Sequence, residues 1–119
     1  MEEIEINGKK YVPKSSIPAK MAINKKGMSY CIVRTYSAGV FAGYIDRNKT
    51  TESGTVYEAI RLWRWEGAFT LSTLATEGTS KPDKCEFAVP IEVDLKNIIE
   101  VIPCSEKSRL SILSVKSKV

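Results

Sequence analysis

Three segments rich in β-branched and aromatic residues follow one another closely, and they constrain the fold more than any other feature of the sequence. They cover residues 30–36, 40–45 and 56–65. Such residues favour strands, and the small residues Ser37-Ala38-Gly39 and a polar turn at 46–54 separate the three segments. Residues 86–93 and 98–102 alternate well enough to be strands as well. The sequence therefore predicts about five strands.

Two short helices complete the predicted fold. Thr70 can cap the first, whose apolar side consists of Leu71, Leu74 and Ala75 and which Gly78 can close. Ser105 can cap the second, which carries Leu110 and Leu113 three residues apart and, in addition, Ile112. We expect an α+β fold built on a small curved antiparallel sheet or half-open barrel of about five strands, with two short helices. Two such helices cannot cover all the large apolar residues of this sheet, so we also expect a homo-oligomer.

The first 27 residues differ in character from the rest of the chain. Ile4-Glu5-Ile6 alternates, Asn7-Gly8 suits a tight type I′ turn, and Tyr11-Val12 could form the returning strand. Residues 13–27 contain Lys, Pro and Ser with few large apolar groups, which is typical of a linker. We therefore divide the chain into an N-terminal hairpin and Lys/Pro/Ser-rich linker, residues 1–27, and a compact ligand-binding domain, residues 28–119.

The residue counts exclude most common enzyme chemistry. The chain has no histidine, so a Ser-His-Asp triad, a Cys-His pair and a histidine-based zinc site are all ruled out. The three cysteines, Cys31, Cys85 and Cys104, stand far apart without a CxxC motif, and we expect them to be small buried residues. We predict that the protein is not an enzyme and holds neither a metal ion nor another cofactor.

The charge and hydropathy patterns limit the partners. The formal net charge is +4, but residues 1–28 and 104–119 each contribute +3, whereas residues 29–103 carry −2. A protein that binds duplex DNA more often shows a basic stripe on its folded face. No apolar run approaches the length of a membrane span, and the acidic N-terminus is unlike a secretory signal. We therefore expect a cytoplasmic protein without a membrane partner.

Two clusters could bind a ligand. The first runs from Arg34 through Tyr36 to the small residues before Val40, where free backbone N–H groups could meet a ligand. In the second, strict alternation places Arg61, Trp63 and Trp65 on one strand face, where stacking rings and a guanidinium suit bases and phosphates. The candidate ligand-binding residues are Arg34, Tyr36, Ser37, Ala38, Gly39, Arg61, Trp63 and Trp65. The structural alternatives are a hairpin turn with one exposed arginine, and core positions for Trp63 and Trp65 with Arg61 at the edge of the core.

These clusters also carry a resemblance. The run from Val33 to Val40, V-R-T-Y-S-A-G-V, and the segment R-L-W-R-W at 61–65 are similar to a widespread family of small phage and prophage proteins of unassigned function. The similarity covers about residues 30–115. Relatives often carry Arg at position 60 and Tyr at position 64, where this chain has Ile60 and Arg64. The resemblance implies a phage or prophage accessory protein that acts in the host cell cytoplasm.

In general character the chain also resembles phage anti-defence "sponges", which sequester the cyclic nucleotide signals of bacterial immunity. That resemblance implies that the protein binds and sequesters a small cyclic nucleotide. In this reading Trp63, Trp65 and Tyr36 would stack bases, and Arg34 and Arg61 would bind phosphate. The alternatives are an accessory protein that binds single-stranded nucleic acid through the same strand, and a virion or partner interaction module that uses the tryptophan pair as an interface.

Overall fold

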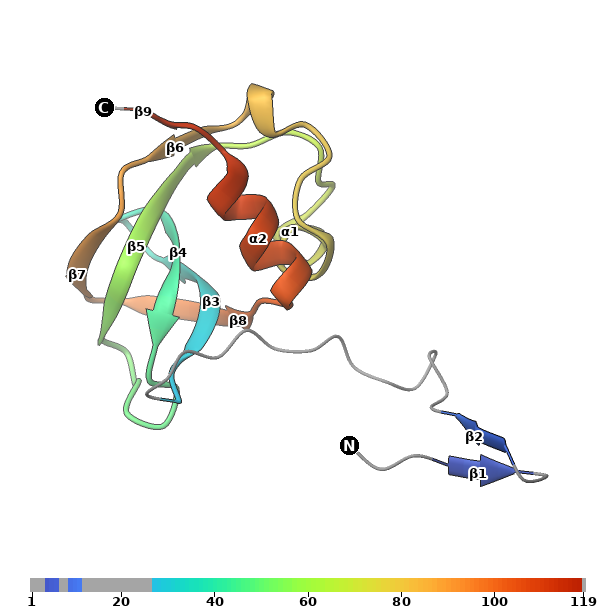
Figure 1. Ribbon diagram of the computed structural model, residues 1–119. Helices are drawn as coiled ribbons and strands as arrows, with labels where there is room; N and C mark the ends of the chain where they lie inside the picture. The colour runs from blue at the N-terminus through green and yellow to red at the C-terminus, as the bar shows by residue number, and fades with distance from the viewer. Residues whose placement is uncertain (1–3, 7–8, 12–26, 119) are drawn as a thin grey trace.

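The computed structural model of the protein describes residues 4–6, 9–11 and 27–118, and it shows an α+β fold with an open, curved sheet (Figure 1). The strands are β1 (Ile4–Ile6), β2 (Lys9–Tyr11), β3 (Ser29–Thr35), β4 (Val40–Ile45), β5 (Gly54–Arg64), β6 (Glu86–Ala88), β7 (Ile91–Leu95), β8 (Ile98–Pro103) and β9 (Ser117–Lys118). The helices are α1 (Leu71–Glu77), the short 3-10 helix η2 (Pro82–Lys84) and α2 (Glu106–Ser114). The expected α+β class with two α-helices is therefore confirmed.

The main sheet has seven strands, more than the five that the sequence predicts. The segment expected at 86–93 divides into β6 and β7 around Val89-Pro90, because proline lacks the N–H that a ladder requires. The other additional strand is β9, which pairs with β6 in parallel (Phe87 with Ser117). A two-residue strand is too short to have a recognisable sequence pattern. Every other strand pair in the sheet is antiparallel, as expected.

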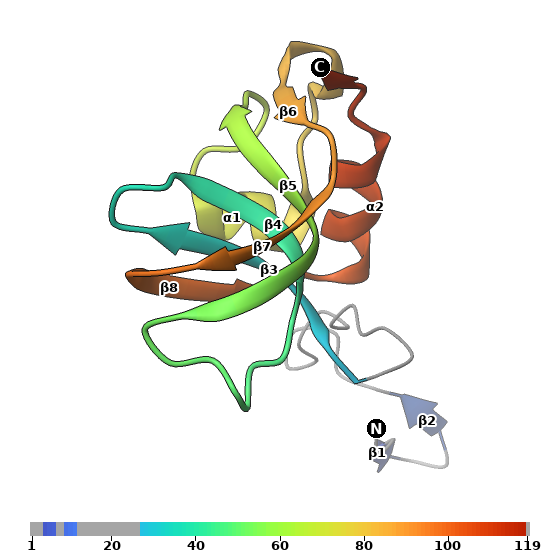
Figure 2. The same ribbon diagram turned by 90° about the vertical axis from the view of Figure 1, so that its left-hand side faces the viewer.

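The sheet curls around β5, whose strong bend is visible in Figure 2. The strand order is β8-β3-β4-β5-β6-β9. Along one edge of β5, the first half of the strand pairs with β7 and the last residues pair with β6. The two residues Lys96 and Asn97 connect β7 to β8, and Asn97 adopts a left-handed backbone with φ of 55°. Among the described residues no ladder joins β7 to β8, so the sheet is open and does not form a closed barrel.

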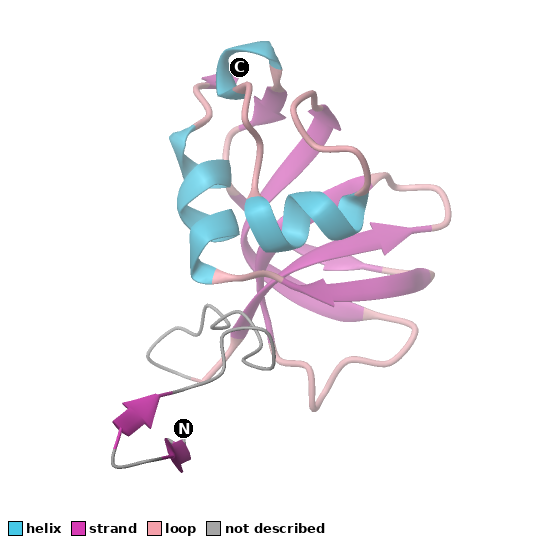
Figure 3. Cartoon of the chain, turned by 90° about the vertical axis from the view of Figure 1, so that its right-hand side faces the viewer, coloured by secondary structure: helices cyan, strands magenta, loops and turns pink. Residues whose placement is uncertain are grey.

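Each face of the sheet buries a cluster of apolar side chains. One cluster lies beneath the helices, which Figure 3 shows over one face of the sheet, and we call this the helix-side core. Its members include Tyr30, Ile32, Ala42, Ile60, Leu62, Leu74, Phe87 and Ile112. The other cluster fills the inside of the curl, and we call it the inner core; it consists of Cys31, Val33, Phe41, Ile45, Val56, Ala59 and Leu95. Consecutive residues of β3 and β4 alternate between the two cores, as the two-residue period of a strand requires.

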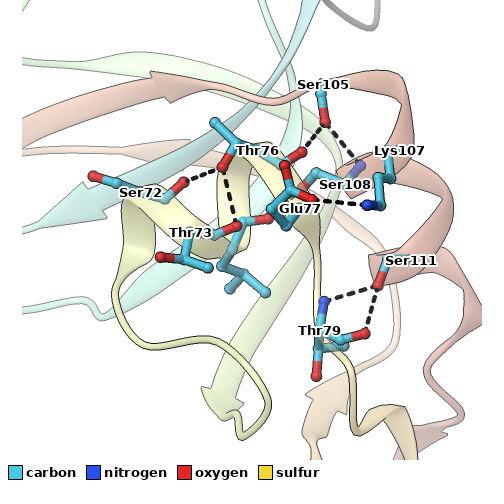
Figure 4. A network of polar contacts seen from close by, with 10 residues as sticks. Ser72, Thr73, Thr76, Glu77, Thr79, Ser105, Lys107, Ser108 and Ser111 are labelled. Carbon is cyan, nitrogen blue, oxygen red and sulfur yellow. Dashed lines mark hydrogen bonds and ion pairs between the residues drawn. The ribbon is translucent and has the colours of Figure 1, made fainter. Parts of the chain in front are cut away.

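The C-terminal end of α1 packs against the side of α2, near its start, through polar contacts, several of which are drawn in Figure 4. The Ser105 N–H donates to the Ala75 carbonyl (2.9 Å), and the Ser105 hydroxyl donates to the Thr76 carbonyl (2.6 Å). The buried Ser108 hydroxyl donates to the Leu74 carbonyl (2.6 Å). The carbonyls that end α1 would otherwise lack helical partners, so the start of α2 completes the end of α1.

The predicted helix caps are confirmed, but the predicted apolar side of α2 is wrong for Leu110 and Leu113. Thr70 and Ser105 each accept a backbone N–H from the residue three positions later, and Gly78 ends α1. On α2, however, Leu110 and Leu113 are exposed, whereas Ile112 is fully buried. The reason is that Ser108 and Ile112, four residues apart, form the buried face. Because Ser108 is polar, a search for apolar residues at helical spacing does not identify this buried face.

The N-terminal hairpin is confirmed as a strand pair, with Ile4 opposite Tyr11 and Ile6 opposite Lys9. The expected Asn7-Gly8 turn and nearly all of the expected linker lie outside the described residues. The three cysteines are buried and free, as predicted. No helix among the described residues is long and apolar enough to cross a membrane.

Candidate functional site

Two irregularities in β5 decide which of its side chains reach the surface. In the first, Ala42 lies opposite Ile60 while Tyr44 lies opposite Tyr57, so β5 has one residue more than β4, and Glu58 takes a left-handed backbone with φ of 53°. In the second, Leu62 pairs with Phe87 and Arg64 with Glu86, so Trp63 is the extra residue. Each is a β-bulge, which interrupts strict alternation of side chains.

The bulge at Trp63 separates the two tryptophans. Trp65 is partly buried against the helix-side core, whereas Trp63 is 75% exposed and lines a hollow with Arg61. The expectation that Arg61, Trp63 and Trp65 share one face is therefore wrong for Trp65. The core alternative is wrong for Trp63, which is at the surface, and holds in part for Trp65, which packs against the helix-side core. Strict alternation fails here because the bulge inserts one residue into the strand.

The hollow beside Trp63 is the candidate site, and we call it the Arg61–Trp63 hollow. It has a volume of about 180 Å³ and is lined by Arg61, Trp63, Glu86, Phe87, Ala88 and Lys118. β5 supplies the arginine and the tryptophan, β6 supplies the glutamate, and β9 supplies the lysine. An exposed indole thus lies among two cations and one carboxylate.

Arg61 is held by an aromatic ring, and no acidic partner binds it in the part of the chain that the structure describes. Its guanidinium carbon lies 4.7 Å from the centroid of the Phe41 ring, within the range of a cation–π contact. Arg34, Arg64 and Arg109 each pair with a glutamate, whereas no carboxylate within the described residues pairs with Arg61. A carboxylate accepts hydrogen bonds from the N–H groups of a guanidinium, whereas an aromatic ring leaves those donors free. The Phe41 ring therefore holds Arg61 in place while its N–H groups can still bind an anion.

The acidic side of the hollow includes a branched ion pair. Arg64 donates to Glu66 (Nη2 to Oε2, 3.1 Å) and lies farther from Glu86 (Nη1 to Oε2, 3.6 Å). All three side chains are about 40% to 60% exposed, so solvent weakens these pairs. Glu66 is therefore the closer partner of Arg64, and Glu86 retains the capacity to accept hydrogen bonds from a ligand.

The structure does not bring Arg34 into the Arg61–Trp63 hollow. Arg34 lies opposite Val40, and Phe41 lies opposite Arg61. Val40 and Phe41 are consecutive residues of one strand, so Arg34 and Arg61 are on opposite faces of the sheet. Arg34 instead donates from Nε to Glu100 Oε1 at 2.9 Å.

The turn after β3 uses much of its hydrogen-bonding capacity internally. The Thr35 N–H and hydroxyl both donate to the Gly39 carbonyl (3.1 and 2.8 Å), and the Ala38 N–H donates to the Thr35 hydroxyl (2.9 Å). The Tyr36 N–H donates to the Asn97 carbonyl (3.0 Å). We expected the backbone N–H groups of this turn to be free for a ligand, but those of Tyr36 and Ala38 donate to other protein groups. Ser37 lies between them and is exposed to solvent.

Tyr36 belongs to a different hollow from Arg61. Its ring is 81% exposed, and it lines a surface depression of about 450 Å³ with Glu52, Asn97, Ile98 and Ile99. The eight candidate residues therefore separate into three groups. Arg61 and Trp63 form one site, Arg34 and the turn at 36–39 lie elsewhere, and Trp65 packs, partly buried, against the helix-side core.

The structure adds three residues that the sequence reasoning missed. Phe41 supports Arg61, and its register opposite Arg61 follows from the β4–β5 hairpin. Glu86 reaches the hollow because β6 pairs with the end of β5. Lys118 reaches it because β9 pairs in parallel with β6 across 29 intervening residues. None of the three has a local sequence signal, because each depends on the register between paired strands.

Comparisons with known proteins give one match. A family model described as a domain of unknown function (DUF6948) matches residues 28–112. This range includes every residue of the hollow except Lys118. No curated protein and no solved structure matches this chain significantly.

Proposed function

The chain belongs to the DUF6948 family of unknown function, and we propose, from the residues of its own site, that it is a non-enzymatic protein that binds a small nucleotide in the Arg61–Trp63 hollow. The indole of Trp63 would stack on the base, and the guanidinium of Arg61 would bind phosphate. Lys118 would supply the second positive charge. The ligand class we propose is a cyclic nucleotide.

One observation carries this proposal: Arg61 is fixed over Phe41 without an acidic partner among the described residues, beside Trp63, which is 75% exposed. An arginine that only stabilised the fold would be expected to pair with a carboxylate, as Arg34 and Arg109 do. An exposed tryptophan contributes little to the stability of the fold, but stacking of a base on its ring contributes about 1–3 kcal/mol to binding. The two groups together suit a ligand that is both aromatic and anionic.

The biological part of the proposal comes from the sequence resemblance. A phage or prophage accessory protein that binds a cyclic nucleotide without turning it over would sequester an immune signal in the host cytoplasm. A hollow of about 180 Å³ is small for a whole cyclic dinucleotide, which favours a site completed in a homo-oligomer. Light scattering of the full chain tests this assembly, and a monomer at tens of micromolar would contradict it.

Single-stranded nucleic acid is the second candidate. Phe69 is 95% exposed and Tyr36 is 81% exposed, and such rings are further platforms on which successive bases could stack. The two candidates differ in the number of phosphates bound. Affinity for a polymer falls steeply with salt, whereas affinity for a ligand with two or three phosphate contacts falls gently.

The experiment that tests the proposal compares two arginines on opposite faces. Binding of cyclic dinucleotides and of a single-stranded oligonucleotide is measured by calorimetry at 50 and 200 mM salt. Arg61→Ala should weaken nucleotide binding by about 2–5 kcal/mol, as expected when one member of a hydrogen-bonded charge pair is removed. Arg34→Ala is the matched control, and its affinity should equal that of the unaltered chain. Equal losses in both variants, or none in Arg61→Ala, would contradict the proposed site.

A further inference from the structure

We infer that the Arg61–Trp63 hollow selects guanine, and that the Glu86 carboxylate recognises the edge of the base. This inference rests on the proposed function, because it names the base that would stack on Trp63. It goes further by assigning Glu86, the one acidic residue among the described residues that line the hollow, to base selection.

The position of Glu86 supports this role. It is the first residue of β6 and lies opposite Arg64 in the ladder, beside the bulge that exposes Trp63. Phe87, the next residue, points into the helix-side core, so Glu86 points to the opposite face, where the hollow lies. Trp63 and Glu86 thus reach the same hollow from adjacent strands, as the face and the edge of a stacked base would require.

The Glu86 carboxylate also has unused acceptor capacity. Its Oε2 lies 3.6 Å from Arg64 Nη1, which is longer than a hydrogen bond. Its Oε1 has no hydrogen bond or ion pair among the described residues. Glu66 makes the closer contact to Arg64, at 3.1 Å, so a ligand could engage Glu86 while Arg64 keeps a partner.

Guanine is the base whose edge matches a carboxylate. Its N1–H and 2-amino groups are two adjacent donors, and an ionised carboxylate offers two adjacent acceptors and no donor. Adenine and cytosine place a ring-nitrogen acceptor beside their amino group, and uracil flanks its N–H with carbonyls, so each would set a lone pair against the carboxylate. A site built to bind one pattern of donors strongly disfavours a base that leaves its polar groups unpaired. The positive charges of Arg61 and Lys118 are left for phosphate.

The test compares two ligands that differ only in their bases. Calorimetry is performed on the full-length chain with cyclic di-GMP and with cyclic di-AMP. We expect cyclic di-GMP to bind about 10- to 100-fold more tightly, the discrimination expected from one bidentate contact to a base. Glu86→Gln should remove most of this preference, because an amide presents a donor to one of the two guanine donors.

Glu66→Gln is the matched control. It also removes a carboxylate partner of Arg64 but does not line the hollow, so it should retain the guanine preference. Equal affinities for the two ligands, or an unchanged preference in Glu86→Gln, would overturn the assignment of guanine while the binding site stands. If neither ligand binds, the proposed function fails, and the inference fails with it.

Discussion

The guanidinium carbon of Arg61 lies 4.7 Å from the centroid of the buried Phe41 ring, and the two residues are direct partners in the β4–β5 ladder. Phe41 is fully buried in the inner core, so its ring is a rigid support. Such a contact contributes about 0.5–1 kcal/mol at an exposed site. Its main consequence is that the positive charge is held in place before any ligand arrives.

Arg61→Lys should separate charge from geometry. Lysine keeps the positive charge but loses the planar fork of donors and the stacking surface. We expect nucleotide affinity to fall about tenfold, and the free energy of unfolding to change by less than about 1 kcal/mol. Calorimetry and urea denaturation measure the two quantities. Full affinity in the lysine variant would show that charge alone is sufficient.

The two tryptophans should respond in opposite ways to truncation. Trp65→Ala removes a ring packed on the helix-side core and should destabilise the protein by about 2 kcal/mol or more. Trp63→Ala removes an exposed ring and should change stability by less than about 0.5 kcal/mol while abolishing base stacking. Thermal melting and ligand titration of both variants check this. A strongly destabilised Trp63→Ala would mean that its ring packs against the protein.

Gly78 and Gly39 both have a positive φ, but only Gly78 is crowded. A Cβ at Gly78 would lie 2.3 Å from Ser111 Cβ, whereas a Cβ at Gly39 would meet nothing within 4 Å. Gly39→Ala should therefore cost about 1 kcal/mol, from backbone strain alone. Gly78→Ala should cost about 3 kcal/mol or more, since it also forces α1 and α2 apart. Urea denaturation of the two variants measures the difference, and similar losses would contradict it.

Two buried thiols should make the protein less stable in alkali. Burial raises the pKa of Cys31 to about 12 and that of Cys104 to about 11, from a usual value of 9.0. Above pH 9 the unfolded chain releases these protons and the folded chain does not, so the free energy of unfolding decreases as pH rises. The stabilisation is complete below pH 9 and is lost as pH rises through 11–12, by up to about 1.4 kcal/mol per pH unit for each thiol.

Urea denaturation at pH 8 and at pH 10.5 measures this loss. Cys31→Ala should reduce the difference in stability between the two pH values, even if it lowers stability at both. A difference that is the same with and without the Cys31 thiol would show that this group does not contribute.

Local sequence signals determined where most elements begin and end. Thr70 and Ser105 cap their helices as predicted, because an N-cap depends on one hydroxyl and a backbone N–H three residues later. β4 has the predicted bounds, Val40–Ile45, because its run of strand-forming residues begins after Gly39 and stops before Asp46. The burial of the three cysteines likewise follows from residue type. Each of these features depends on a few neighbouring residues, which is why the sequence alone was sufficient.

The candidate site was decided by tertiary structure. Strict alternation predicts that Trp63 and Trp65 share a face, but pairing with β6 creates the bulge that turns one outward and the other into the core. A bulge depends on the registers of both partner strands, and no local residue pattern encodes them. The separation of Arg34 from Arg61 follows from registers on two sides of β4. Lys118 enters the hollow through a pairing between β6 and the end of the chain. Which side chains meet was therefore set by long-range strand pairing, a property of the folded chain.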